Sequence, residues 1–152
     1  MKFLLGLMVV VLVGSVGWAV SWETSAWQVG VGTVFGYLGG ALGAQIGAAV
    51  AQAAGWGLID GVLAPILCAY VGYALGSTVG AWAGVTWTGF RLGSLGDPWF
   101  SLLGAGLGTG LAFLLASFTD WEWAFYLSPP LAALGATLAF ASFSSAKVSG
   151  AP

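Results

Sequence analysis

Charged side chains are almost absent from this chain. Its 152 residues include three basic and five acidic side chains and no histidine. A soluble domain carries charge on about a quarter of its residues. Three scattered cations cannot neutralise a phosphate backbone, which excludes nucleic-acid binding. The net charge of −2 is also too small to indicate an electrostatic partner.

The residues that enzymes use most are missing too. Histidine is the commonest general base and the commonest transition-metal ligand. The sequence offers no serine–lysine pair, no metal-ligand spacing and no buried acid pair in its place. It therefore predicts a protein that is not an enzyme and that binds no cofactor. Cys68 is the only cysteine, so no disulfide forms within the chain. We interpret this residue as a small buried apolar side chain.

Long apolar stretches fill most of the sequence. Apolar residues make up 59% of the chain, and its mean hydropathy is +0.98. Tryptophan concentrates at membrane–water interfaces, and seven of the nine tryptophans, all but Trp18 and Trp82, lie at the edges of these stretches. The intervals predict four membrane spans, at 29–55, 65–88, 99–118 and 129–146. Each has about 18 to 27 residues, enough for a helix to cross a hydrocarbon core of about 30 Å.

The predicted fold class is an all-α membrane protein. We expect a bundle of about four tightly packed transmembrane helices over 21–146 and a flexible tail at 147–152. A transmembrane β-barrel is the alternative, but barrel strands alternate polar and apolar residues, and here the apolar runs are continuous. Orientation stays open. Four full crossings put Arg91 and Lys147 outside, against the positive-inside tendency. If residues 29–88 cross only once, or loop back in a re-entrant fashion, both cations lie inside.

The first 20 residues have the layout of an export signal. Lys2 precedes an apolar run from Phe3 to about Val13, and small residues follow at Gly17 and Ala19. This is the pattern of a secretory signal peptide cleaved after Ala19. An uncleaved signal anchor is the alternative, since about 18 apolar residues nearly suffice to cross a bilayer. Either way, the sequence predicts export to a membrane.

Glycine recurs at every fourth position through three of the predicted spans. Residues four apart lie on one face of a helix, and a stripe of small residues lets two helix backbones approach closely in lipid. The first span carries two such stripes, Gly32, Gly36, Gly40, Ala44, Ala48 and Gly39, Gly43, Gly47, Ala51, Gly55. The second carries Gly72, Gly76, Gly80 and Gly84; the third carries Gly104, Gly108 and Ala112 beside Gly106 and Gly110. The fourth has Ala132, Ala136 and Gly135, Ala139. These positions are the predicted helix-packing sites.

With these repeated G-x-x-x-G runs, the chain resembles small bacterial glycine-zipper membrane proteins over roughly residues 30–112. The resemblance implies a bacterial cell-membrane location and association through the glycine faces. We therefore expect a structural or accessory integral membrane protein that lies in membrane lipid and forms homo- or hetero-oligomers with itself or other membrane proteins. The alternative is a homo-oligomeric channel or small transporter, lined by Gln45, Gln52, Thr78 and Thr109.

Few polar residues stand out within or beside the spans. Gln45 and Gln52 are seven apart and share a helix face, where they could bond to another helix or line a polar pathway. Asp60 precedes Gly61 and is interpreted as an interfacial turn residue rather than a proton or cation site. Asp120 and Glu122 are interpreted as part of a solvated interfacial loop, with a cation site or acid–base pair as the alternative.

Overall fold

The chain folds into long helices. The computed structural model describes residues 22–55, 63–94, 96–120 and 122–148, and in these ranges it has four helices and no strand. They are α2 (Trp22–Ala53), α3 (Leu63–Arg91), α4 (Pro98–Ser117) and α5 (Glu122–Val148). The predicted signal at 1–20 and the Asp60–Gly61 turn lie outside the described residues. The all-α bundle predicted from the sequence is confirmed.

Each of the four helices is long and apolar enough to cross a membrane. Their apolar side chains point outward as well as inward. Leu42, Leu75 and Leu107, for example, are 61%, 63% and 77% exposed. Large aliphatic side chains exposed all along a helix are stable against lipid tails but not against water. The chain is therefore a membrane protein with four candidate spans.

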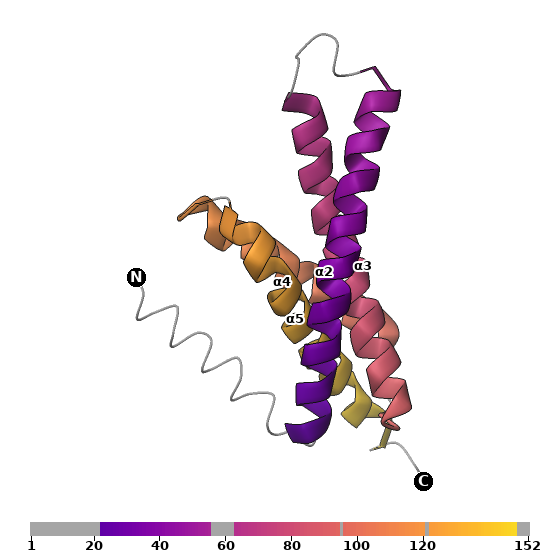
Figure 1. Ribbon diagram of the computed structural model, residues 1–152. Coiled ribbons are helices and arrows are strands. Elements are labelled where there is room, and N and C mark those ends of the chain that lie inside the picture. The colour runs from indigo at the N-terminus through magenta and orange to yellow at the C-terminus, as the bar shows by residue number, and fades with distance from the viewer. Residues whose placement is uncertain (1–21, 56–62, 95, 121, 149–152) are drawn as a thin grey trace.

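The helices form two hairpins that pack against each other (Figure 1). Contact pairs fix their directions. Gly39 lies against Gly76 and Gly47 against Cys68, so α2 and α3 are antiparallel. α4 and α5 form the second antiparallel pair, which packs across the first at an angle in Figure 1. The α2–α3 hairpin extends well past the tip of the α4–α5 hairpin.

The centre of the bundle is built mainly from alanine. A cluster of buried side chains fills the junction of the hairpins: Ala81, Val85, Ala105, Ala132, Ala133, Ala136 and Phe140. Small side chains let the helix axes approach closely, and close packing is the main force between helices in lipid. Trp82 covers this cluster and donates its indole N–H to the Pro98 carbonyl oxygen at 2.7 Å. The Ser77 and Ser128 hydroxyls also bond across the hairpins, at 2.9 Å.

The helix ends follow familiar capping rules. α2 begins seven residues before its predicted span of 29–55 and ends two residues before the end of that span, whereas α3 extends two residues before and three residues after its span of 65–88. At the start of α4, the Asp97 carboxylate accepts the Trp99 backbone N–H at 2.8 Å, and Pro98 takes the first helical position. At the end of α3, Gly93 has a φ of 76°. Ser94 N–H donates to the Gly89 carbonyl at 2.9 Å, which is the closing bond of a Schellman motif.

The fourth helix differs from its predicted start. The fourth predicted span begins at 129, but α5 begins at Glu122 and contains Pro129 and Pro130. A proline inside a helix leaves the carbonyl four residues earlier without its N–H partner. These carbonyls are those of Phe125 and Tyr126. Tyrosine hydroxyls from other helices bond to both, as described below, which removes much of the penalty for the prolines.

Candidate functional site

Glycine faces from α2 and α3 meet along one contact line. We call this line the α2–α3 seam; it is formed by Gly39, Gly43 and Gly47 with Gly72, Gly76 and Gly80. A Cβ added at Gly39 would collide with the Gly76 carbonyl oxygen, and a Cβ at Gly76 would collide with the Gly39 carbonyl oxygen. The same reciprocal relation joins Gly43 and Gly72. The backbones are therefore in direct contact, and only glycine fits.

The second glycine stripe of α2 lies outside the α2–α3 seam and consists of Gly32, Gly36 and Gly40. Gly32, Gly36 and Gly40 are all buried. A Cβ at Gly32 would lie 2.6 Å from Val85 Cγ2 on α3 and 3.1 Å from Ala133 Cβ on α5. One at Gly36 would lie 3.0 Å from Pro129 Cβ on α5, so this stripe faces the line where α3 and α5 meet. A Cβ at Gly40 would lie 2.7 Å from the Tyr73 ring. One glycine stripe of α2 thus packs against α3 alone, and the other packs between α3 and α5. Gly84 completes the contact from α3, with its Cβ position 2.9 Å from Gly32 Cα.

A second, shorter seam joins α4 and α5. Gly104 faces the Gly135 carbonyl oxygen and Gly108 faces that of Leu131, again at distances that exclude a Cβ. Gly106 and Gly110 point the other way, and a Cβ at either would meet nothing within 4 Å among the described residues. The two glycine series that the sequence places side by side in this span therefore differ: one packs and the other faces outward.

The α2–α3 seam has an open apolar groove above it. Because the seam residues have no side chains, the space between the flanking ridges stays unfilled, and the resulting groove measures about 710 Å³. Its walls are Leu42, Ile46 and Val50 from α2 and Val71, Leu75 and Val79 from α3. Cys68, half-buried, contributes to the floor. The groove can hold apolar groups such as lipid tails or the side chains of another helix.

Gln45 and Gln52 lie on the exposed side of α2. Gln45 follows Gly43 by two residues, which is about 200° around the helix, so it points away from the α2–α3 seam. Neither amide makes a side-chain hydrogen bond within the described ranges. Thr78 and Thr109 are elsewhere: their hydroxyls bond to each other at 2.8 Å between α3 and α4. The structure does not bring the four proposed pathway residues together.

Sequence reasoning missed a set of buried polar side chains. Gln28 is 1% exposed, and neither its amide nitrogen nor its amide oxygen has a hydrogen-bond partner in the described part of the chain. Ser25, Ser101 and Thr137 also have buried hydroxyls without such a partner. A Cβ added at Gly89 would lie 2.6 Å from the Gln28 amide nitrogen. The signal was present in the sequence, because Gln28 extends the Gly32, Gly36, Gly40 stripe by one turn.

Two tyrosines hold the proline-containing part of α5. The Tyr73 hydroxyl donates to the Phe125 carbonyl oxygen at 2.6 Å, and the Tyr37 hydroxyl donates to the Tyr126 carbonyl oxygen at 2.8 Å. These are the two carbonyls that Pro129 and Pro130 leave without a helical N–H donor. We call these four residues and two prolines the tyrosine–proline junction. It joins three helices, since Tyr37 lies on α2 and Tyr73 on α3.

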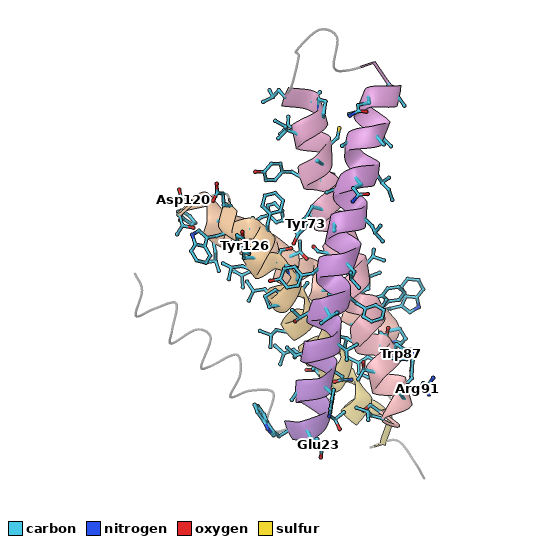
Figure 2. The ribbon with its side chains drawn as sticks, viewed as in Figure 1. Glu23, Tyr73, Trp87, Arg91, Asp120 and Tyr126 are labelled. Atoms are coloured by element: carbon cyan, nitrogen blue, oxygen red, sulfur yellow. The ribbon has the colours of Figure 1, made fainter. Side chains whose placement is uncertain are left out.

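The charged side chains that the structure describes lie near the helix ends rather than in the interior. Figure 2 shows Asp120 at the tip of the α4–α5 hairpin and Arg91 and Glu23 near the opposite end of the bundle. Asp120 and Glu122 are both exposed. The Arg91 guanidinium lies over the Trp87 ring, 5.4 Å from its centroid. No group of three or more histidine, cysteine, aspartate or glutamate side chains suited to a metal ion occurs in the part of the chain that the structure describes.

The described residues thus form a close-packed bundle with an open apolar groove beside the α2–α3 seam. The tyrosine–proline junction lies where the α4–α5 hairpin meets α2 and α3. No protein-family model, no curated protein and no solved structure matches this chain.

Proposed function

We propose that this protein is a structural or accessory integral membrane protein that works by associating with itself or with other membrane proteins. The observation that carries the proposal is the apolar groove beside the α2–α3 seam, with its two ridges of exposed aliphatic side chains. In lipid, interlocking side chains on such ridges provide van der Waals contact between helices. We propose a non-enzymatic role because the sequence has no histidine, the commonest general base.

The occupant we propose for the groove is a second copy of the chain. Its two walls have the same chemistry, and each consists of large aliphatic residues three to four apart on one helix. A ridge of one copy can therefore lie in the groove of the other and the reverse, which is the arrangement of a two-fold dimer. In this proposal, the glycines close each chain on itself and the ridges beside them join the copies.

Native mass measured in mild detergent tests this association. Val79 lines the groove, and Val79→Trp would fill it without touching the glycine contacts. Val34 is similarly exposed but does not line the groove, so Val34→Trp is the matched control. We expect a discrete oligomer for the parent and for Val34→Trp and a monomer for Val79→Trp. A monomeric parent extracted without any partner, or an oligomer unaffected by Val79→Trp, would contradict the proposal.

A homo-oligomeric channel or small transporter is the second candidate. Gln45 and Gln52 support it, because both amides are exposed on α2 and point away from the rest of their own chain. Only several chains together could arrange them around a pore. Gln45→Leu with Gln52→Leu should then abolish conductance in planar bilayers and leave the oligomer intact. Unchanged conductance of an intact oligomer would exclude this pathway.

We also infer that the protein is exported and resides in a bacterial inner membrane. Support comes from the signal-like first 20 residues and from the likeness to glycine-zipper proteins. The intact mass of protein from its own membrane tests the first part. A mass lacking residues 1–19 indicates a cleaved signal, a full-length mass indicates an anchor, and recovery from the cytosolic fraction would contradict export.

A further inference from the structure

A cavity of about 450 Å³, open to the surroundings, lies where α2, α3 and the first turns of α5 meet. Its lining is Tyr37, Tyr73, Glu122, Phe125 and Tyr126. Figure 2 shows Tyr73 and Tyr126 near one another, between the α2–α3 hairpin and the tip that carries Asp120. Its size falls within the range of small-molecule binding sites, about 300 to 1,000 Å³. The cavity is separate from the apolar groove, whose lining residues are different.

Aromatic rings form most of the cavity wall. Tyr73 meets Phe125 edge to face, with ring centroids 4.8 Å apart and an interplanar angle of 79°. Outside the cavity, Trp123 packs against Tyr126 at 6.3 Å. These contacts hold the rings in place. The face of an aromatic ring carries partial negative charge and attracts a cation placed within about 6 Å of its centroid.

The polar atoms of the lining are acceptors. The Tyr37 and Tyr73 hydroxyl protons are already donated to the Tyr126 and Phe125 carbonyl oxygens, so both phenolic oxygens are left to accept hydrogen bonds. The Glu122 carboxylate accepts as well. Among the residues that the structure describes, no lysine or arginine lines the cavity, and Arg91 lies over Trp87 at the other end of the bundle. An anionic ligand would find no counter-charge here.

The local charge is negative even though the cavity adjoins a helix N-terminus. The first turn of α5 contributes about half a positive charge from the helix dipole. Glu122 contributes a full negative charge from the same turn, and Asp120 adds another two residues earlier. The carboxylates therefore outweigh the dipole, and the net field favours a cation.

We propose that this cavity binds an organic ammonium group, primary or quaternary, through the rings of Tyr37, Tyr73, Phe125 and Tyr126 and the carboxylate of Glu122. Two sources share this chemistry: the ethanolamine or choline headgroup of a phospholipid, and a free amine in solution. The surroundings favour the headgroup. Trp123 and Tyr126 are of the residue types that concentrate at the membrane–water interface, where headgroups lie, and the charge of Glu122 beside them would be costly deeper in the bilayer. Specific retention of a zwitterionic lipid would fix the height and tilt of the α4–α5 hairpin in the bilayer.

Retained lipid measured by native mass spectrometry tests the proposal. The full chain is reconstituted in vesicles of equal parts phosphatidylethanolamine, phosphatidylcholine and phosphatidylglycerol and then extracted in mild detergent. We expect bound phosphatidylethanolamine or phosphatidylcholine to exceed phosphatidylglycerol. Tetramethylammonium or ethanolamine added to delipidated protein, followed by tryptophan fluorescence, forms the second arm. A change in tryptophan fluorescence on adding the amine identifies a site that is open to free amines. Enrichment of the zwitterionic lipids without a fluorescence response to amines identifies a headgroup site.

Three variants separate the cavity from general attraction. Glu122→Gln and Tyr126→Leu each remove one element of the wall, and we expect about a 10-fold loss of ammonium affinity or lipid enrichment for each. Both residues are exposed, so neither change disturbs the core. Asp120→Asn removes an equal charge two residues before α5, at a position that does not line the cavity, and we expect less than about a 3-fold change. Equal losses in Asp120→Asn and Glu122→Gln, or no lipid preference and no amine response in the parent, would overturn the proposal.

Discussion

The tyrosine–proline junction makes a prediction that links α3 to the helix irregularity in α5. Tyr73→Phe removes the hydroxyl that donates to the Phe125 carbonyl oxygen and keeps the ring. That carbonyl has no helical N–H donor, because residue 129 is proline. Leaving a buried acceptor without a partner costs about 1 to 3 kcal/mol in water-soluble proteins, and hydrogen bonds between membrane helices average about 0.6 kcal/mol with a maximum near 2. We expect Tyr73→Phe to lower the free energy of unfolding by about 1 to 2 kcal/mol.

A double-mutant cycle isolates the cause. Pro129→Ala restores a backbone N–H that can donate to Phe125, and it keeps the Cβ that packs against Gly36. Tyr73→Phe should therefore cost clearly less in the Pro129→Ala background than in the parent, with a coupling energy of about 1 kcal/mol. The free energy of unfolding is measured by titrating detergent-solubilised protein with sodium dodecyl sulfate and following helix content.

The control for the cycle is Tyr126→Phe. Tyr126 is 63% exposed, and its own hydroxyl makes no hydrogen bond within the described residues, so its removal should leave stability unchanged. If Tyr73→Phe costs the same in the parent as in the Pro129→Ala background, to within about 0.3 to 0.5 kcal/mol, the two residues act independently. The hydroxyl would then not compensate for the proline, and our account of α5 would be refuted.

Two further predictions concern glycine and buried amide groups. Gly76→Leu should separate α2 from α3 and lower the free energy of unfolding by about 1 to 3 kcal/mol or more, because a Cβ at this position collides with backbone atoms. Gly106 faces open space, so Gly106→Leu should change the free energy of unfolding by no more than about 0.5 kcal/mol. Equal effects of the two changes would refute the close backbone contact along the α2–α3 seam. Gln28→Leu should raise the free energy of unfolding by about 1 kcal/mol, because a buried amide without partners is replaced by an apolar side chain. A loss of stability in Gln28→Leu, in the same sodium dodecyl sulfate titration, would show that the amide has a partner.

Much of the fold could be predicted because the apolar stretches and the glycine spacing are regular along the sequence. Long apolar stretches predicted four helices, and the four-residue period of glycine in 32–47 and 72–84 identified the faces that now lie in contact. The period alone could not say which of two interleaved stripes meets which neighbour. It also could not separate Gly104 and Gly108, which pack, from Gly106 and Gly110, which face outward, because both series have the same spacing.

The start of α5 and the aromatic cavity could not be predicted, because both depend on contacts between residues that are far apart in the sequence. Ser128, Pro129 and Pro130 form a strong local signal for a helix end, and that signal was overridden by hydroxyl groups from Tyr37 and Tyr73, far away in the sequence. The aromatic cavity was hidden for the same reason. Its residues are separated in the chain by up to about 90 positions, and only the packing of α5 against α2 and α3 brings them together.

The central claim is that one chain closes its own four-helix bundle, with the α4–α5 hairpin packed against the α2–α3 hairpin. Ser77 and Ser128 connect these hairpins through hydroxyls 2.9 Å apart. The most direct test is oxidation of Ser77→Cys with Ser128→Cys in a Cys68→Ala background, with the product identified by mass after unfolding. The bundle predicts a disulfide within a single chain. A disulfide-linked dimer, or free thiols under conditions that oxidise an exposed pair, would contradict it.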